Sequence, residues 1–245
     1  YEGILHLEAF MAIKAVLFDL DGTLLPMDQD AFVQYYFGSL AKKLAPMGYD
    51  PEKLIGAIWA GTKAMIKNDG TVTNEEAFWQ CFATIFGENA RKDEPHFDAF
   101  YRNEFINAKA ACGYNEKAAL LVDAVKEKGL RAVLATNPIF PDVSTSRRIQ
   151  WAGLDKNDFE LYTTYENSRF CKPNPAYYQE ILDQLGLKGE ECVMIGNDAV
   201  EDVAAMQCGM QVFLITDCLL NKTNADISAI PQGTFDDAIA FVKAL

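Results

Sequence analysis

Short apolar runs alternate along most of the chain with stretches in which hydrophobic residues recur at helical spacing. The runs that we interpret as strands lie at 13–18, 131–135, 159–163, 191–195 and 211–216. Helical spacing falls at 115–128, 142–151, 175–185, 200–207 and 235–243. Continuous hydrophobic runs are typical of strands buried on both faces of a parallel sheet. The alternation therefore predicts an α/β fold with a Rossmann-like, doubly wound parallel sheet.

Residues 29–110 break this rhythm, because they carry helical patterns and no convincing strand. Thr73 lies three residues before Glu76, a capping-box pattern that predicts the start of a helix. Asp50 before Pro51 predicts another helix start, since proline is favoured in the first helical turn. An all-helical block is therefore inserted between the first strand and the rest of the sheet.

These patterns divide the chain into two expected domains. We assign residues 11–27 and 111–245 to a discontinuous α/β core, and residues 28–110 to an inserted all-α helical domain. Residues 1–10 are expected to be an upstream extension that takes no part in the fold.

The composition narrows the possible partners. The 245 residues are 50% hydrophobic and carry a formal net charge of −13. Because affinity for nucleic acid depends mainly on Lys and Arg that neutralise phosphates, neither nucleic acid nor an anionic membrane surface is an expected partner. No apolar run is long enough to span a bilayer. The six cysteines form no metal-binding pattern, which favours reduced thiols and a cytoplasmic location.

Polar residues gather just after the predicted strands. The set comprises Asp19, Asp21, Thr136, Asn137, Lys172, Asn197, Asp198 and Asp202. An isolated Asp-x-Asp-Gly is as often a simple turn as a functional site. Because the carboxyl ends of parallel strands share one edge, however, these side chains are expected to lie together, where ligands bind. Carboxylates, a hydroxyl, an amide and an ammonium are the groups that Mg²⁺-assisted phosphoryl transfer needs.

Four stretches in this order closely resemble the haloacid dehalogenase superfamily. They are FDLDGTL at 18–24, LATNP at 134–138, CKPNP at 171–175 and MIGNDAVED at 194–202. The resemblance extends from about residue 12 to residue 216. It implies a Rossmann-like core, an all-helical cap of the C1 type at residues 28–110, and Mg²⁺ as cofactor.

The resemblance also implies a role for each matching residue. Asp19 would be the nucleophile and a metal ligand. Asp21 would be the general acid and then the base, with its backbone carbonyl on the metal. Thr136 and Asn137 would hold the phosphoryl group. Lys172 would offset the charge between the nucleophile and the phosphate.

The metal ligand of the fourth stretch is the point where this chain departs from the family pattern. Family members often carry Gly-Asp where this chain has Gly196-Asn197. We expect Asp198 to supply the carboxylate, with Asp202 behind it. Asn197, through its amide oxygen, and Asp202 remain the alternatives.

The second aspartate indicates the activity that the resemblance implies. Family members that displace halide lack an acid at the position of Asp21, so its presence favours hydrolysis of a small phosphorylated metabolite through a phosphoaspartate on Asp19. A phosphomutase of the same superfamily and a non-catalytic binding module are the alternatives. The oligomeric state has no sequence signal.

Some other residues are expected to have structural rather than functional roles. The aromatic residues of the helical block, such as Trp59, Trp79 and Phe82, occur at helical spacing, which indicates packing rather than a substrate pocket. For Arg147 and Arg148 the alternatives are contact with a substrate and an exposed helix face, and we favour the exposed face.

Overall fold

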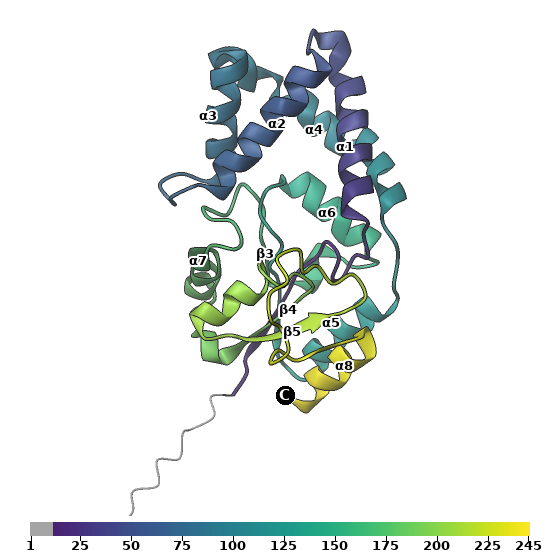
Figure 1. The fold of residues 1–245 in the computed structure, drawn as a ribbon, viewed down its shortest axis with the longest axis vertical. Coiled ribbons are helices and arrows are strands. Elements are labelled where there is room, and N and C mark those ends of the chain that lie inside the picture. The colour runs from purple at the N-terminus through teal and green to yellow at the C-terminus, as the bar shows by residue number, and fades with distance from the viewer. Residues whose placement is uncertain (1–11) are drawn as a thin grey trace, which may run out of the picture.

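The computed structural model describes residues 12–245, and its lower half contains a parallel sheet (Figure 1). The sheet has six strands in the order β3-β2-β1-β4-β5-β6. Their bounds are β1 Ala15–Phe18, β2 Arg131–Leu134, β3 Leu161–Tyr162, β4 Cys192–Gly196, β5 Gln211–Ile215 and β6 Gln232–Gly233. Every neighbouring pair is parallel, with β1 between β2 and β4. The predicted fold class is confirmed, although the short edge strand β6 was not predicted.

The two faces of β1 pack into separate hydrophobic clusters, because successive side chains of a strand point to opposite faces. The helices around the sheet are α5 Lys117–Glu127, α6 Asp142–Trp151, α7 Pro175–Leu185 and α8 Phe235–Ala244. Val16 and Phe18 belong to the cluster of α5 and α8, whereas Ala15 and Leu17 belong to the cluster of α7. This arrangement explains why β1 is apolar at every position.

Short 3-10 helices complete the core. They are η4 Lys156–Asp158, η5 Gly189–Glu191 and η6 Val203–Cys208. The helix expected at 200–207 is thus the 3-10 helix η6, which is only six residues long. It ends at Gly209, whose φ of 87° is a left-handed conformation that glycine adopts without strain.

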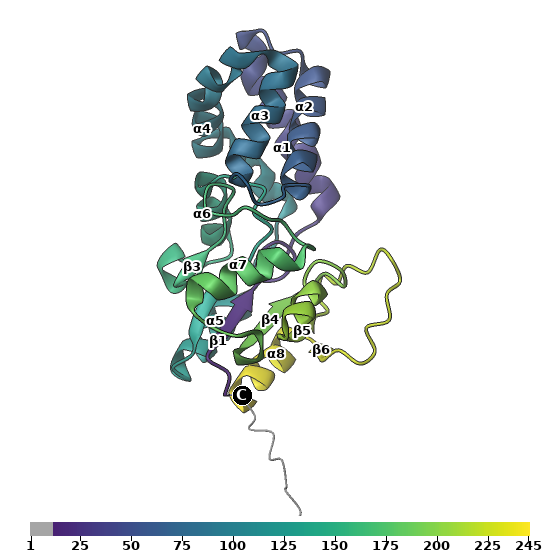
Figure 2. The same ribbon diagram turned by 90° about the vertical axis from the view of Figure 1, so that its left-hand side faces the viewer.

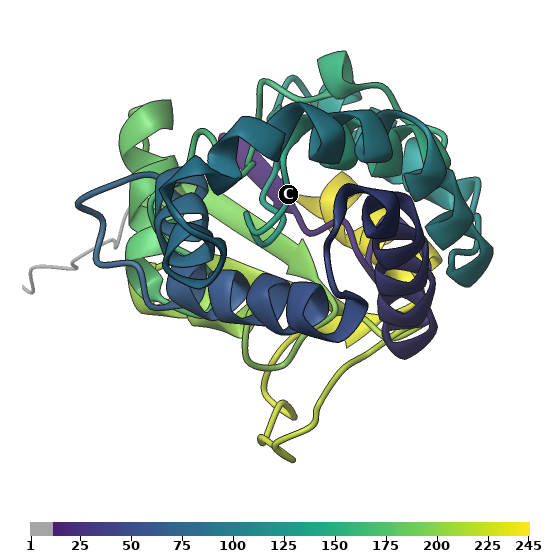
Figure 3. The ribbon, with the colours of Figure 1, turned by 90° about the horizontal axis from the view of Figure 1, so that it is seen from above.

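The chain between β1 and α5 is helical, as expected, and no strand lies between residues 29 and 110. Its elements are α1 Gln29–Leu44, η1 Ala45–Met47, α2 Pro51–Ile66, α3 Asn74–Phe86, η2 Glu88–Asp93, α4 Glu94–Arg102 and η3 Glu104–Ala111. Asp50 and Thr73 cap the starts of α2 and α3 through their side chains, which confirms both predicted helix starts. Figure 2 shows this block above the sheet, and Figure 3 shows the strands beneath it.

The two connections between the block and the sheet run side by side. Met27 and Cys112 form an antiparallel bridge, and the backbone N–H of Gly113 donates to the carbonyl of Pro26 at 2.7 Å. Domain boundaries at residues 27/28 and 110/111 stay a prediction. The extension expected at residues 1–10 lies outside the described residues.

Three further expectations concern the described residues. All six cysteines are free thiols. Among residues 12–245, none of the helices combines the length and apolarity needed to cross a bilayer. Trp79 and Phe82 are buried, as expected, but Trp59 is 52% exposed. Trp59 packs edge-on against Phe37 of α1, with the ring centres 5.3 Å apart, but it also borders a cavity, so the expectation of packing holds only in part for Trp59.

Asn74 at the start of α3 ties the helical block to the loops of the core. Its side chain is fully buried. Its Nδ2 donates to the carbonyls of Pro138 and Phe170 at 3.3 and 3.2 Å, and its Oδ1 accepts from Asn68 at 3.0 Å. The two carbonyls belong to loops that follow β2 and β3, so one amide joins three segments.

We expect Asn74→Ala to lower the free energy of unfolding by about 1–3 kcal/mol, because it leaves buried polar groups unpaired. Urea denaturation of both proteins measures the difference. The matched control is Asn107→Ala, since Asn107 is exposed and donates only to Ser39. Equal stability of the two variants would contradict the role given to Asn74.

Candidate active site

The carboxyl end of β1 continues directly into a tight turn. The backbone N–H of Asp19 donates to the carbonyl of Ile195, so the sheet ladder holds Asp19 in register with β4. Gly22 has a φ of 85°, and a Cβ there would lie 2.4 Å from Nδ2 of Asn197. Glycine is therefore required at this position both by the backbone conformation and by the close approach of Asn197.

Lys172 is the centre of the site. Its side chain is fully buried, and Nζ lies 2.9 Å from Oδ1 of Asp19 and 2.7 Å from Oδ1 of Asp202. Burial alone would lower the pKa of Lys172, but Asp19 and Asp202 together raise it well above its usual value. The lysine is thus a permanent ammonium between two carboxylates.

The surroundings of Asp19 are more negative than the ammonium of Lys172 alone can offset. Burial raises the pKa of Asp19 to about 8; Lys172 opposes this shift, while Asp202 and Asp21 add to it. A further positive charge beside Asp19 would favour its ionised form. The carboxylate therefore lies where a cation is needed for it to act as a nucleophile.

The loop after β2 contains Thr136 and Asn137, the two residues expected to hold the phosphoryl group, and it contacts Lys172. Thr136 is buried and borders the cavity, and its carbonyl accepts from the hydroxyls of Thr163 and Tyr177 at 2.6 and 2.8 Å. Asn137 accepts the backbone N–H of Lys172 through Oδ1 at 3.2 Å. Asn137 thus joins this loop to the backbone of Lys172, and Thr136 and Asn137 border the same cavity as Asp19.

The three candidate residues in the turn after β4, which are Asn197, Asp198 and Asp202, have different hydrogen-bond partners. Asp202 is buried, and its Oδ2 accepts the backbone N–H groups of Asn197 and Asp198, both at 2.9 Å. Oδ1 of Asp198 accepts the N–H groups of Val200 and Glu201, so this carboxylate caps the following turn. Asp202 thus supports the turn from behind and pairs with Lys172.

Asn197 faces Asp19 through a shared neighbour. The hydroxyl of Thr23 lies 3.0 Å from Oδ1 of Asn197 and 3.3 Å from Oδ2 of Asp19. Nδ2 of Asn197 donates to the carbonyl of Cys218 at 2.7 Å, which fixes the orientation of the amide. The oxygen of Asn197, and not its nitrogen, therefore faces the hydroxyl that also contacts the carboxylate of Asp19.

The oxygens at this edge are suited to a hard cation. Among residues 12–245, no three His, Cys, Asp or Glu side chains gather in a group that could hold a metal ion by themselves. Oxygens of Asp19 and Asn197 nevertheless flank one hydroxyl, and Oδ1 of Asp21 is buried without a hydrogen-bond partner. Mg²⁺ typically takes one or two carboxylates and completes its shell with water and phosphate. The residues present therefore fit Mg²⁺.

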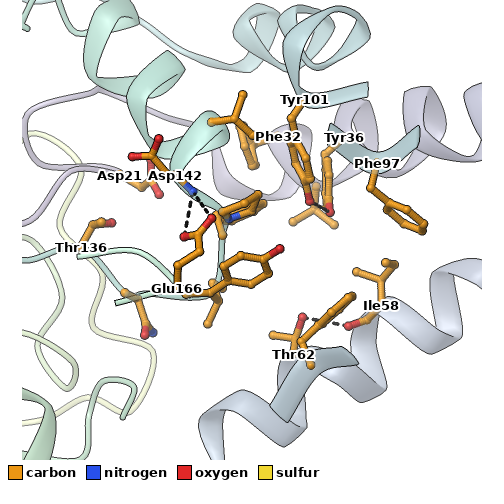
Figure 4. A pocket seen from close by; sticks show the side chains of 18 of the residues that line it. Asp21, Phe32, Tyr36, Ile58, Thr62, Phe97, Tyr101, Thr136, Asp142 and Glu166 are labelled. Carbon is orange, nitrogen blue, oxygen red and sulfur yellow. Dashed lines mark hydrogen bonds between the residues drawn. The ribbon is translucent and has the colours of Figure 1, made fainter. Parts of the chain in front are cut away.

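A cavity of about 810 Å³ opens above this edge, between the sheet and the helical block (Figure 4). From the sheet edge it is bordered by Asp19, Asp21, Thr136, Asn137, Asn197, Asp198 and Glu201. Lys172 and Asp202 lie buried behind this surface. The structure thus brings every predicted site residue to one place, six of them on the cavity and two behind it.

Arg148 is a site residue that the sequence reasoning missed. It is fully buried, its Nη1 contacts Oδ2 of Asp21, and its guanidinium lies 4.5 Å from the ring centre of Phe140. The expectation of an exposed helix face is therefore wrong for Arg148. The buried residues of α6 include Thr145 and Ile149, and this spacing could have placed Arg148 on the buried face.

Glu201 is a second missed residue. Both of its carboxylate oxygens accept from Nδ2 of Asn137 at 3.2 Å. Burial raises the pKa of Glu201 to about 7; Lys172 opposes the shift, and Asp202 and Asp198 add to it. Asn137 thus links Lys172 to an acid that borders the cavity.

Comparison with known proteins identifies the family of the chain. The chain matches the sequence profile of the haloacid dehalogenase-like hydrolases over residues 13–209, so it belongs to this family. It is 27% identical over 243 residues to a glyceraldehyde 3-phosphate phosphatase of Methanothermobacter thermautotrophicus, covering 89% of this chain and 95% of that protein. The resemblance inferred from the four motifs is confirmed.

Two solved structures share the fold. A 2-haloacid dehalogenase from Pseudomonas syringae has a TM-score of 0.60 and 17% identity, covering 95% of this chain and 98% of that one. An enzyme of the family from Bacteroides thetaiotaomicron, solved with magnesium and inorganic phosphate, has a TM-score of 0.53 and 17% identity, covering 87% and 98%. Both support the architecture of the chain.

We expect Glu201→Gln to change how stability depends on pH. The folded state of the natural protein holds the Glu201 proton up to about pH 7, whereas the ordinary pKa is 4.5. Stability is therefore lost as pH rises between these values, and the glutamine variant should not show this loss. Urea unfolding should find the variant stabilised relative to the natural protein at about pH 8 and not at about pH 4.

The control for this experiment is Glu127→Gln, which changes an exposed glutamate at the end of α5. The same pH-dependent gain in both variants would show that net charge, and not burial at the site, produces the effect.

Proposed function

We propose that the protein is a Mg²⁺-dependent phosphatase that hydrolyses a phosphate monoester through a phosphoaspartate on Asp19. The observation that carries this proposal is the buried ammonium of Lys172 beside Asp19. It lies behind a surface that also presents Asp21, Thr136 and Asn197. The name of the Methanothermobacter relative, a phosphatase of a small phosphorylated compound, supports the same activity.

In the proposed reaction, an oxygen of Asp19 attacks phosphorus while the bond from phosphorus to the ester oxygen breaks. Asp21 gives its proton to the departing oxygen and becomes a carboxylate. The guanidinium of Arg148, which contacts Asp21, stabilises this negative charge. Thr136 and the ammonium of Lys172 stabilise charge on the phosphoryl group.

In the second half, the carboxylate of Asp21 takes a proton from water. The resulting hydroxide attacks phosphorus, and the bond to Asp19 breaks to release inorganic phosphate and restore the enzyme. Asp21 thus serves first as acid and then as base, which returns the proton count to its starting value.

Mg²⁺ would be held by Asp19, by the backbone carbonyl of Asp21 and by Oδ1 of Asn197. When bound, it neutralises negative charge on the nucleophile and the phosphate. We favour Asn197 over Asp198, which the sequence suggested, because Oδ1 of Asp198 is occupied by two backbone N–H groups. Asp202 would act through its contacts with Lys172 and the turn.

The helical block at residues 28–110 would act as an all-α cap on this site. It contributes the side of the cavity opposite Asp19 and Thr136. A cap that closes over bound substrate excludes water during the attack of Asp19 and admits it for hydrolysis. The choice of substrate would therefore depend on the block, and the chemistry on the sheet edge.

We expect the protein to hydrolyse p-nitrophenyl phosphate with Mg²⁺ and to lose this activity in EDTA. Asp19→Asn should reduce turnover by at least about 10³-fold, because the amide cannot form the phosphoaspartate. Measuring inorganic phosphate distinguishes the two activities. A phosphatase releases it from a natural substrate, whereas a mutase returns the phosphoryl group to the substrate. If Asp19→Asn turned over substrate as fast as the unsubstituted protein, the assignment of the nucleophile would be disproved.

The metal ligand of the fourth motif can be tested by titrating activity with Mg²⁺. Asn197→Ala should raise the Mg²⁺ concentration for half-maximal activity by about tenfold or more, because it removes a ligand oxygen. Asp198→Asn is the matched variant, and it should change this concentration by less than about threefold. A larger shift in Asp198→Asn would assign the ligand to Asp198.

A further inference from the structure

The cavity above Asp19 is larger than a phosphoryl group needs. Its volume of about 810 Å³ reaches from Asp19 and Thr136 to side chains of α1, α2, α3 and α4. Pockets of this size typically enclose ligands as large as drug molecules. With the phosphoryl group at the sheet edge, most of the volume is left for the part of the substrate that departs.

Aromatic rings form much of the wall of this remaining space, beside polar side chains such as Gln29, Lys92 and Glu166. The rings that border it include Phe32, Tyr36, Trp59, Phe97, Tyr101 and Phe140. Figure 4 shows Phe32, Tyr36 and Tyr101 on the helical side of Asp21, with Phe97 beyond them. Trp59 is half exposed, so its indole is available to a ligand without any change in the packed interior.

The hydroxyls in these walls are already paired. The hydroxyls of Tyr36 and Tyr101 lie 2.8 Å apart, and burial raises the pKa of Tyr36 to about 12 and that of Tyr101 well above its usual value. Both phenols are therefore neutral. Thr62 donates its hydroxyl to the carbonyl of Ile58 in its own helix at 2.9 Å. Thr62 is thus satisfied within its own helix, and the tyrosine pair uses one of its two phenolic protons, so of these three hydroxyls only one O–H is left to donate to a ligand.

The arginines that border the space are also engaged. Arg91 forms ion pairs with Glu75, Glu76 and Glu94. Arg102 pairs with Asp98 on its own helix. The arginine charges are thus matched by carboxylates of the same block, and neither guanidinium is left to bind a polar substituent.

We propose that the substrate is a phosphate monoester whose leaving group is large and apolar and carries an aromatic ring. This proposal rests on the phosphatase function proposed above. An apolar leaving group gains free energy in proportion to the surface it buries against the rings. Sugar hydroxyls that lie against the rings would instead lose water without gaining a hydrogen bond there, which is unfavourable. The walls therefore select against sugar and triose phosphates.

The test compares phosphate esters of primary alcohols, whose leaving groups differ little in acidity. Ethyl phosphate, 3-phenylpropyl phosphate, glycerol 1-phosphate and glyceraldehyde 3-phosphate form the series. We expect kcat/KM to rise by up to about fourfold for each buried methylene and to be highest for the phenylpropyl ester. A flat series, or a preference for either of the polar esters, would overturn the proposal.

A variant with a matched control locates the effect. Trp59→Ala should lower kcat/KM for 3-phenylpropyl phosphate by about tenfold and leave ethyl phosphate nearly unchanged. Tyr35→Ala removes an exposed ring of α1 that does not border the cavity, and it should change neither substrate. Equal losses on both substrates in Trp59→Ala would contradict selection by the aromatic walls.

Binding without turnover separates this proposal from the proposed function. Calorimetry of the natural protein with Mg²⁺ should find tighter binding of 3-phenylpropylphosphonate than of ethylphosphonate. This result would stand even if every ester in the series were inert, an outcome that would refute the phosphatase function alone. Equal binding of the two phosphonates would refute the apolar substrate.

Aromatic walls can also bind a quaternary ammonium through cation–π contacts. Choline phosphate and its carbon isostere, 3,3-dimethylbutyl phosphate, differ in this charge and little in shape. We expect the neutral ester to be hydrolysed with kcat/KM equal to or above that of choline phosphate. A preference of about tenfold or more for choline phosphate would overturn the proposal of an apolar leaving group.

Discussion

The sheet edge that carries the candidate active site depends on one buried ammonium. Lys172 is enclosed by protein and lies within 2.9 Å of Asp19 and 2.7 Å of Asp202. A charge in such a place is tolerated only when it is paired, and removing one partner of a buried pair typically costs about 3–5 kcal/mol. The three residues come from the end of β1, the loop before α7 and the turn after β4. Their pairing therefore fixes the relative positions of all three segments.

The same arrangement leaves the site short of positive charge. Lys172 faces two carboxylates, and burial with the neighbouring acids raises the pKa of Asp19 to about 8. Arg148 contributes a second buried cation, but it contacts Asp21. An incoming phosphate adds further negative charge. In the proposed reaction, attack by an ionised Asp19 would therefore need another cation, and this is the role that the proposal gives to Mg²⁺.

Much of this site could be predicted from the sequence, because parallel strands deliver their carboxyl ends to one edge. Asp19, Thr136 and Asn197 lie within two residues of the ends of β1, β2 and β4. The strand pattern alone was therefore enough to predict that they share one location. Arg148 and Glu201 lie within helical or turn segments; the sequence pattern favoured an exposed position for Arg148 and gave no signal for Glu201. Their burial depends on how α6 and the turn after β4 pack, which is a tertiary property.

The aromatic residues of the helical block show a different limit of the sequence. A helix face that packs on its neighbours and a face that borders a cavity are both apolar, so periodicity cannot distinguish them. Phe82 and Trp59 illustrate the two cases, since one is fully buried and the other is half exposed beside the cavity. The distinction appears only when α1, α2 and α4 are placed around a shared space. Because that space meets the charged edge at one end and many aromatic rings elsewhere, the proposed function assigns the chemistry to the edge and the recognition of the departing group to the helical block.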